Sequence, residues 1–151
     1  VRPGVALYGV NHAPVEGMEA VVTLTARIIQ LREVRTRHSV GYGATREVEA
    51  GTRLATVPVG YADGYFRALS NCGEVAIAGR KAPIVGRVSM DLIVVDVTDI
   101  PAEALFIGAA VELMGPHILV EDVAQQAGTI GYEVLTRLGG RFKRVYSNGK
   151  G

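Results

Sequence analysis

Apolar and polar residues alternate along much of this chain. Between residues 22 and 28 every second residue is apolar, a period of two that is typical of a half-buried strand. The phase of the alternation shifts near Gln30 and Leu31, which predicts a bulge or a bend there. Further strand-like runs cover residues 52–60, 74–78, 82–85, 92–97 and 110–114. Glycine-rich breaks separate these runs, so the pattern predicts a small antiparallel barrel or sandwich.

Helical patterns occur only near the carboxy-terminal end. Residues 121–127 predict a short helix that ends at Gly128, because glycine tolerates the left-handed conformation after a helix. Thr129 predicts the N-cap of a second helix, in which Glu133 lies near the positive end of the helix dipole. Residues 141–146 are basic and compatible with a strand. The predicted fold is therefore one mainly β, barrel-like domain with one or two short helices near its end.

Composition narrows the class of protein. The chain has 151 residues, 48% of them hydrophobic, which is enough for a buried core without disulfides. With 16 basic and 15 acidic residues its net charge is +1, so no global field favours nucleic acid or an acidic membrane surface as a partner. No run approaches the roughly 20 apolar residues that span a bilayer. Cys72 is the single cysteine, which fits a reducing compartment, and with no export leader expected we predict a cytoplasmic protein.

Several familiar site patterns are missing from the sequence. His12, His38 and His117 are scattered and have no cysteine or histidine neighbours at zinc-ligand spacing, so no metal site is predicted. The paired glycines at 41 and 43 lack the six-residue pattern of a dinucleotide fingerprint.

Three segments, residues 41–45, 60–65 and 129–133, place a tyrosine next to glycine. Glycine lets the backbone turn sharply and brings the phenol close to a partner or ligand. A phenol donates or accepts hydrogen bonds, and it serves as a general base if cations lower its pKa from the usual value near 10. A tyrosine is nevertheless more often a half-buried sheet residue with its hydroxyl at the surface.

Residues 82–91 form a further candidate segment. Arg87, Met90 and Asp91 follow an apolar strand that ends in glycine, and strand ends often present polar groups to a pocket. A solvated loop with an Arg/Asp surface pair explains the same pattern more simply. From the residues alone, the prediction ends at a soluble β-domain with a surface lined by tyrosine and arginine.

Taken together, five segments resemble bacterial alanine racemases, which depend on pyridoxal phosphate. They are VRPGVALYG at 1–9, SVGYGAT at 39–45, VGYADG at 59–64, APIVGRVSMD at 82–91 and IGYEVL at 130–135. They follow the order and approximate spacing of the family, and the resemblance covers essentially the whole chain.

The resemblance implies a two-domain enzyme with an amino-terminal α/β barrel and a carboxy-terminal, mainly β domain. Residues 1–9 resemble the end of the barrel domain, and residues 10–151 resemble the carboxy-terminal domain. The three lysines, Lys81, Lys143 and Lys150, do not lie in a context that resembles the lysine that binds the cofactor aldehyde. We therefore expect the covalent anchor to belong to the missing barrel domain and the chain alone to be inactive.

The resemblance also implies roles for individual residues. Tyr42 matches the catalytic tyrosine, the base on the face of the substrate opposite the lysine. Arg2 matches the arginine that pairs with the pyridine nitrogen of the cofactor. Gly4 and Val5 match backbone positions that bind its phosphate, and Tyr132 matches a phosphate-binding tyrosine.

The remaining matched residues belong to the substrate site or to the corridor that leads to it. They are Tyr61, Arg67, Arg87 and Met90, with Asp91 beside them.

The family further implies a head-to-tail homodimer, in which the tyrosine serves the active site of the partner subunit. Racemisation of L- and D-alanine links such enzymes to amino-acid metabolism, either to the supply of D-alanine for the cell wall or to the breakdown of D-alanine. Without a barrel domain, we expect residues 1–9 to be frayed and an apolar, tyrosine-rich face to be uncovered.

Two other interpretations stay open at this point. The chain fits a racemase for another small amino acid, such as serine, or a decarboxylase with the same two-domain plan, although a decarboxylase does not need the tyrosine in residues 41–45. The second of these interpretations is a non-catalytic β-barrel binding module. Such a module needs exposed aromatic side chains on which bases stack. These are scarce here, since aromatic residues make up 6% of the chain and tryptophan is absent.

Overall fold

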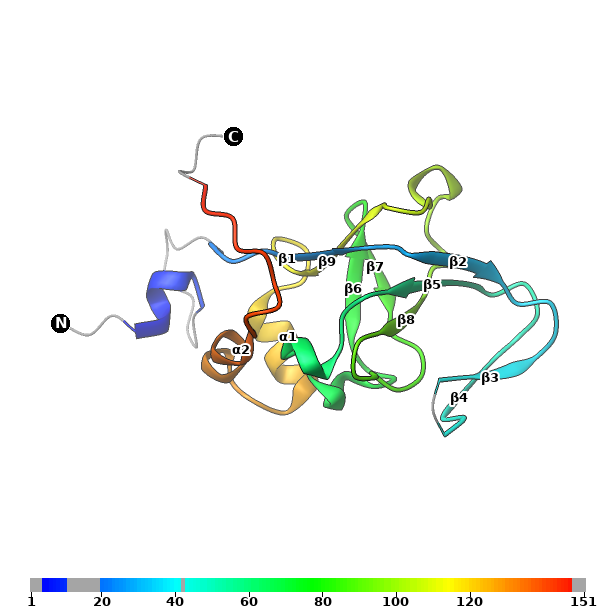
Figure 1. Cartoon of the computed structure of the whole chain (residues 1–151), viewed down its shortest axis with the longest axis horizontal. Helices are drawn as coiled ribbons and strands as arrows, with labels where there is room; N and C mark the ends of the chain where they lie inside the picture. The colour runs from blue at the N-terminus through cyan, green and yellow to red at the C-terminus, as the bar shows by residue number, and fades with distance from the viewer. Residues whose placement is uncertain (1–3, 11–19, 42, 148–151) are drawn as a thin grey trace.

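A computed structural model of the chain describes residues 4–10, 20–41 and 43–147 (Figure 1). Arg2 and Tyr42 lie outside these ranges. The larger sheet has the order β1 (Leu24–Arg27), β9 (Ala110–Met114), β6 (Glu74–Ile77) and β7 (Arg80–Pro83), and all of its pairs are antiparallel. Strand β9 lies between β1 and β6, so the first strand of this sheet pairs with the last one along the chain.

A second sheet contains β2 (Gln30–Glu33), β5 (Arg53–Val57) and β8 (Ile93–Asp96), in that order. The chain passes from the first sheet to the second between Ile28 and Ile29. The amide of Ile28 donates to Ala109 of one sheet, and the amide of Ile29 donates to Thr56 of the other. The predicted bend near Gln30 therefore exists but lies slightly earlier, where two successive amides find partners in different sheets.

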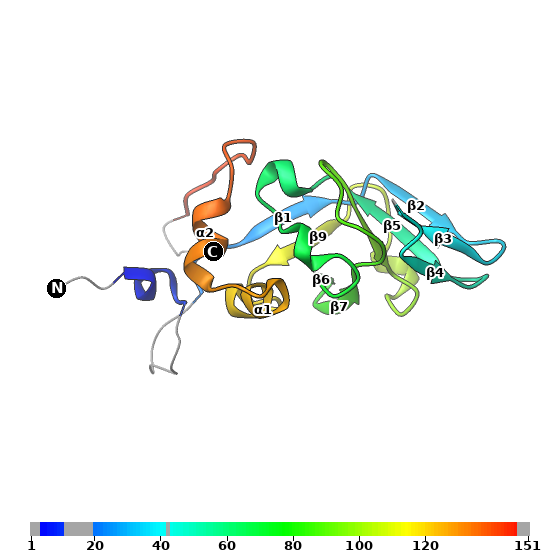
Figure 2. The ribbon, with the colours of Figure 1, turned by 90° about the horizontal axis from the view of Figure 1, so that it is seen from below.

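A two-stranded hairpin, β3 (His38–Val40) and β4 (Arg46–Val48), extends from the second sheet. Figures 1 and 2 show this hairpin at one end of the elongated molecule. The helices α1 (Val120–Ala127) and α2 (Gly131–Arg137) gather at the other end with the 3₁₀ helix η1 (Gly4–Tyr8).

The two α-helices lie where the sequence predicts them. α1 ends at Gly128, whose φ of +70° is the left-handed conformation expected there. α2 begins after Ile130, and Thr129 hydrogen-bonds through its hydroxyl to the carboxylate of Glu133 instead of capping the backbone. The prediction of a mainly β domain with short helices near its end is confirmed, and the strands of the described ranges do not close into a barrel.

The core fills the space between the two larger sheets and the helices. Leu69, Val75, Val111 and Leu113 are fully buried in it. Val5 belongs to the same cluster, whereas Leu7 and Tyr8 are exposed, and the fraying expected of residues 1–9 stays a prediction. None of the helices in the described ranges has the length and apolar character needed to cross a bilayer.

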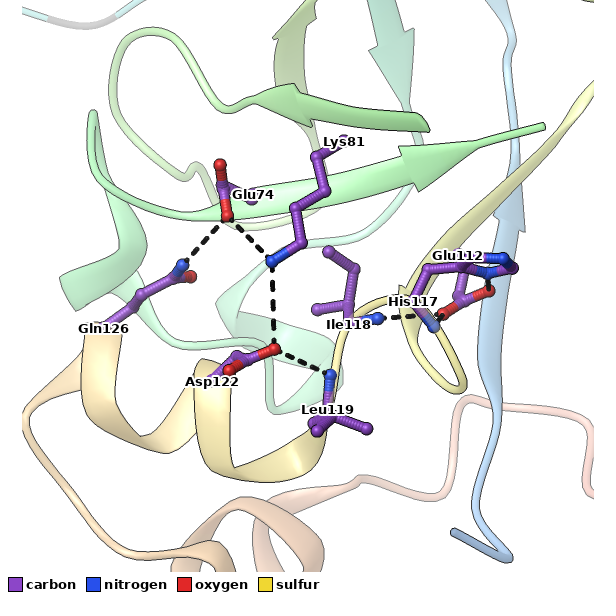
Figure 3. Close-up of polar contacts among 8 residues, drawn as sticks. All are labelled: Glu74, Lys81, Glu112, His117, Ile118, Leu119, Asp122 and Gln126. Atoms are coloured by element: carbon purple, nitrogen blue, oxygen red, sulfur yellow. Dashed lines mark hydrogen bonds and ion pairs between the residues drawn. The ribbon is translucent and has the colours of Figure 1, made fainter. Parts of the chain in front are cut away.

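Polar side chains fasten α1 to the β6–β7 hairpin (Figure 3). Lys81 Nζ lies 3.4 Å from Glu74 Oε2 and 3.9 Å from Asp122 Oδ2. Asp122 also accepts a hydrogen bond of 3.1 Å from the amide of Leu119 at the start of the helix. Lys81 therefore has a structural role, because its ammonium group bridges Glu74 of β6 and Asp122 of α1.

Candidate functional site

The loop between β3 and β4 packs directly on residues 86–87. A Cβ added to Gly41 would lie 3.0 Å from the amide nitrogen of Arg87, and one added to Gly86 would lie 2.9 Å from the carbonyl oxygen of Val40. Both glycines also have positive φ, +76° and +80° respectively. This close approach requires glycine on both sides, and it joins two segments that are separate in the sequence.

Arg87 turns its guanidinium toward this loop. A Cβ added to Gly43 would lie 3.4 Å from Arg87 Cζ, so the charged group lies against the backbone of Gly43. Arg87 is exposed and has no ion-pair partner among the described side chains. A positive charge therefore lies against Gly43, the residue that follows Tyr42 in the sequence.

Asn71 also holds the β3–β4 loop next to Gly86, through hydrogen bonds to both segments. Its Oδ1 accepts a 2.7 Å hydrogen bond from the amide of Gly86, and its Nδ2 donates a 3.1 Å bond to Thr45 Oγ1. Its own amide donates to the carbonyl of Gly86 at 3.2 Å, and its φ is +62°. Asn71 is not among the site residues predicted from the sequence; its only signal there is a turn in which asparagine tolerates the left-handed conformation.

Arg67 comes close to this group through its backbone. It begins the 3₁₀ helix η3 (Arg67–Leu69), and the next residue, Ser70, bonds to the segment between β7 and β8, because Ser70 Oγ accepts a 3.1 Å hydrogen bond from the amide of Val88. The guanidinium of Arg67 itself makes no hydrogen bond or ion pair with the described side chains, and it is exposed.

Tyr61 and Met90 are brought together by their backbones. The amide of Tyr61 donates to the carbonyl of Ser89 at 3.1 Å, and the amide of Ala62 donates to the carbonyl of Met90 at 3.0 Å. A Cβ added to Gly60 would lie 2.3 Å from Met90 O, so this glycine permits the contact. The side chains of Tyr61 and Met90 are 43% and 54% exposed and thus available to a ligand.

A charged bridge holds these two segments at their ends. Asp63 accepts a 2.8 Å hydrogen bond from the amide of Gly60, and its other oxygen lies 3.3 Å from Arg141 Nε. Arg141 Nη1 lies 2.8 Å from Asp91 Oδ1. The hydrogen bond to Asp91 and the charge of Asp63 raise the pKa of Arg141. Arg141 is not among the site residues predicted from the sequence, because its local pattern is only a basic, strand-compatible run.

Tyr65, the second tyrosine of residues 60–65, belongs to the core and not to the site. Burial raises the pKa of its phenol, with a smaller contribution from Cys72. Its hydroxyl is buried and has no hydrogen-bond partner in the described part of the chain. It is therefore unsuited to act as a base.

Gly4, Val5 and Tyr132 meet at the opposite end of the molecule. A Cβ added to Gly4 would lie 3.1 Å from the hydroxyl oxygen of Tyr132. All three residues line a cavity of about 830 Å³, to which Lys143 and Arg144 contribute positive charge. A site with bare backbone, a phenol and cations suits an anionic group.

Comparisons with known proteins identify the family that this chain resembles. Residues 21–146 match the family described as alanine racemase, C-terminal domain. The chain is 51% identical over 147 residues to the alanine racemase of Rickettsia canadensis, covering 97% of this chain and 40% of the relative. It is 47% identical over 160 residues to the alanine racemase of Brucella canis, covering 96% of this chain and 40% of the relative.

Solved structures show the same likeness. The alanine racemase of Bartonella henselae, which has covalently bound pyridoxal phosphate, superimposes with a TM-score of 0.88 and 43% identity over 95% of this chain and 40% of its own. The biosynthetic alanine racemase of Pseudomonas aeruginosa gives a TM-score of 0.88 and 42% identity, over 96% of this chain and 41% of its own. The chain thus spans about two fifths of the length of the relatives that it matches.

Proposed function

Because the chain belongs to the family of alanine racemase C-terminal domains, we propose that it is the carboxy-terminal part of a pyridoxal-phosphate-dependent isomerase that interconverts L- and D-alanine. The observation that carries this proposal is the glycine-dependent packing of the tyrosine loop, residues 41–45, against Gly86 and Arg87. It brings together two of the segments on which the resemblance depends.

The residues around Gly4 fit the phosphate of the cofactor. The space next to Gly4 would be filled by a Cβ, which would come 3.1 Å from the hydroxyl oxygen of Tyr132. In our proposal the backbone of Gly4 and Val5 and the hydroxyl of Tyr132 hold the phosphate, and Arg2 pairs with the pyridine nitrogen. Since arginine does not readily give up a proton, the ring nitrogen would stay largely unprotonated. When bound, pyridoxal phosphate supplies the electron sink that makes the α-proton of an amino acid acidic.

In this proposal Tyr42 is the base on one face of the substrate. Racemisation requires a proton to leave one face of the α-carbon and another to arrive at the opposite face. A phenol has an ordinary pKa near 10, and a neighbouring cation favours its ionised form. We propose Arg87 as this cation, because its guanidinium lies against Gly43, the residue that follows Tyr42.

The arrangement of the chain supports a homodimer in which the tyrosine serves a second subunit. The β3–β4 hairpin lies at one end of the molecule, and Gly4 and Tyr132 lie with η1 and α2 at the other (Figures 1 and 2). In our proposal, one chain therefore does not bring the hairpin that carries the tyrosine and the phosphate-binding residues to the same cofactor. A two-fold dimer, with each tyrosine loop docked on the barrel of the partner, would do so at both sites.

Tyr61, Arg67, Arg87, Met90 and Asp91 complete the proposed site as residues that contact the substrate or line the path to it. Their segments are joined by the bonds of Ser70, Asn71 and Arg141 described above. We further propose that the chain is inactive without the barrel domain, that the complete enzyme works in the cytoplasm, and that it supplies D-alanine for the cell wall.

The direct test compares Tyr42→Phe with the wild type in the complete enzyme, measuring conversion of L-alanine to D-alanine. Loss of a positioned base costs roughly 10²- to 10⁴-fold in rate, so a fall within that range is expected. Tyr65→Phe is the matched control, because it removes a hydroxyl that has no partner in the described structure and should leave the rate unchanged. Full activity of Tyr42→Phe would refute the assignment, and faster conversion of serine than of alanine would favour a serine racemase.

A further inference from the structure

The segment that follows α2 returns to the Gly60–Asp63 turn and is fixed there by its backbone. The amide of Gly139 donates a 3.0 Å hydrogen bond to the carbonyl of Asp63. Gly64 lies against the carbonyl of Arg137, with room for no side chain. These contacts place Arg141 next to the turn independently of the charge that Arg141 carries.

Arg141 contacts two carboxylates from two different segments. Its Nε faces Asp63, and its Nη1 faces Asp91 at 2.8 Å. The side chain of Asp63 is only 10% exposed, and its second oxygen is already bound to the amide of Gly60, so its position is fixed. A planar guanidinium presents separate N–H groups in a rigid fork and can hold both acceptors at once, whereas the point charge of lysine cannot reproduce this geometry.

The two carboxylates belong to the segments that carry Tyr61 and Met90. Asp63 follows Tyr61 by two residues in the 3₁₀ helix η2 (Tyr61–Asp63), and Asp91 directly follows Met90. The amide bonds from Tyr61 to Ser89 and from Ala62 to Met90 hold the segments together at the same place. Arg141 therefore adds a side-chain bridge to the backbone hydrogen bonds that join the two segments.

We propose that Arg141 is a positioning residue, which sets the relative placement of Tyr61 and Met90 and thereby the affinity for the amino-acid substrate. This inference rests on the proposed function, since it takes Tyr61 and Met90 as residues of the substrate path. Arg141 acts through Asp63 and Asp91 and takes no part in proton transfer.

The test measures KM and kcat for L-alanine in the complete enzyme with Arg141→Met, Arg141→Lys and Asp91→Asn. We expect KM to rise about fivefold in Arg141→Met with kcat within about twofold of the wild type, the pattern for loss of ground-state placement. Arg141→Lys should recover part of the loss. The double variant Arg141→Met/Asp91→Asn should be no worse than Arg141→Met alone, because both changes break the same bridge.

Arg80→Met is the control, because Arg80 is an exposed arginine on β7 without an ion pair among the described side chains. The second measurement is hydrogen exchange at the amides of Tyr61 and Ala62, which should become faster in Arg141→Met and not in Arg80→Met. Unchanged KM, or unchanged exchange at these amides, would overturn the role of Arg141. A wild-type enzyme that does not racemise alanine would instead overturn the proposed function.

Discussion

Gly64 lies so close to Arg137 that a Cβ on Gly64 would come within 1.9 Å of the carbonyl oxygen of Arg137. The φ of Gly64 is +96°, a conformation that residues with a side chain rarely adopt. The contact joins the turn after Tyr61 to the end of α2. Gly64, the second glycine of the motif at residues 60–65, therefore has a structural role in addition to any role in the site: it permits the contact with the end of α2.

Gly64→Ala should destabilise the chain strongly. The new methyl group would clash with backbone, which cannot move aside like a flexible side chain, and we expect the free energy of unfolding to fall by about 3 kcal/mol. Denaturant unfolding of the isolated chain measures this loss. Gly140→Ala is the matched control, because a Cβ at Gly140 would meet nothing within 4 Å. Equal stability of the two variants would contradict the contact.

Asn71→Gly should loosen the tyrosine loop without straining the backbone. Glycine keeps the positive φ of Asn71 and its backbone bond to the carbonyl of Gly86 but removes the two side-chain hydrogen bonds, one from the amide of Gly86 and one to Thr45 Oγ1, each worth about 1 kcal/mol. The complete enzyme should therefore lose kcat, because the loop that contains Tyr42 is no longer fixed. Thr45→Ser keeps a hydroxyl partner for Asn71 and should behave like the wild type. A normal kcat in Asn71→Gly would show that other contacts are sufficient to hold this loop in place.

Glu112 should make the stability of the chain depend on acid pH. Burial raises the pKa of Glu112, but hydrogen bonds from the ring and amide of His117 and from the amide of Ile118 outweigh it, and the pKa lies below its ordinary value (Figure 3). A carboxyl with a lowered pKa in the folded state stabilises the fold above its unfolded-state pKa. This stabilisation is lost as the pH falls through the folded-state value.

Unfolding of the wild type and of Glu112→Gln should therefore be compared from neutral pH down to about pH 3, a range that spans the ordinary carboxyl pKa. The two proteins should differ most at neutral pH and converge in acid. Glu103→Gln, a change on the exposed 3₁₀ helix η4 (Ala102–Ala104), is the control and should show no such convergence. A constant difference between wild type and Glu112→Gln at every pH would contradict the pKa shift.

The isolated chain should self-associate through the rim of the large cavity. Val21, Val145 and Tyr146 line this cavity and are exposed, which makes an apolar surface that a barrel domain would cover. Sedimentation at rising concentration should show dimers or larger species, and Val145→Lys should shift them to monomer. Ile107→Lys alters an exposed apolar residue that does not line the cavity and should have little effect. If the isolated chain stays monomeric at high concentration, the prediction that it self-associates through this surface is wrong.

Sequence patterns could predict the elements that have a strong local signal. The alternation at 110–114 and the glycine after residue 127 correspond to β9 and the end of α1. The strand predicted at residues 82–85 lies two residues earlier, at Arg80–Pro83. The hairpin turn is at Ala78 and Gly79, and β7 starts directly after it. Strands β3 and β4 were not predicted. They are short, and only their mutual pairing distinguishes them from the glycine-rich loop that they flank.

The site was predicted only as separate motifs. No local pattern indicates that Gly41 touches Gly86 or that Gly60 touches Met90, because these contacts depend on how strands are placed in different sheets. Asn71 and Arg141 were missed for the same reason. Each is an ordinary polar residue in its own segment, and its significance comes from partners 15 or more positions away.

The position of β9 in the larger sheet has a consequence for how the protein is made. During synthesis β1 and β6 leave the ribosome before the strand that must lie between them, since β9 pairs with both and ends at Met114. Until then, the nascent chain exposes strand edges that can pair with other chains. Ribosome-bound chains that stop short of residue 110 should therefore depend on chaperones, whereas chains a few dozen residues longer should fold unaided.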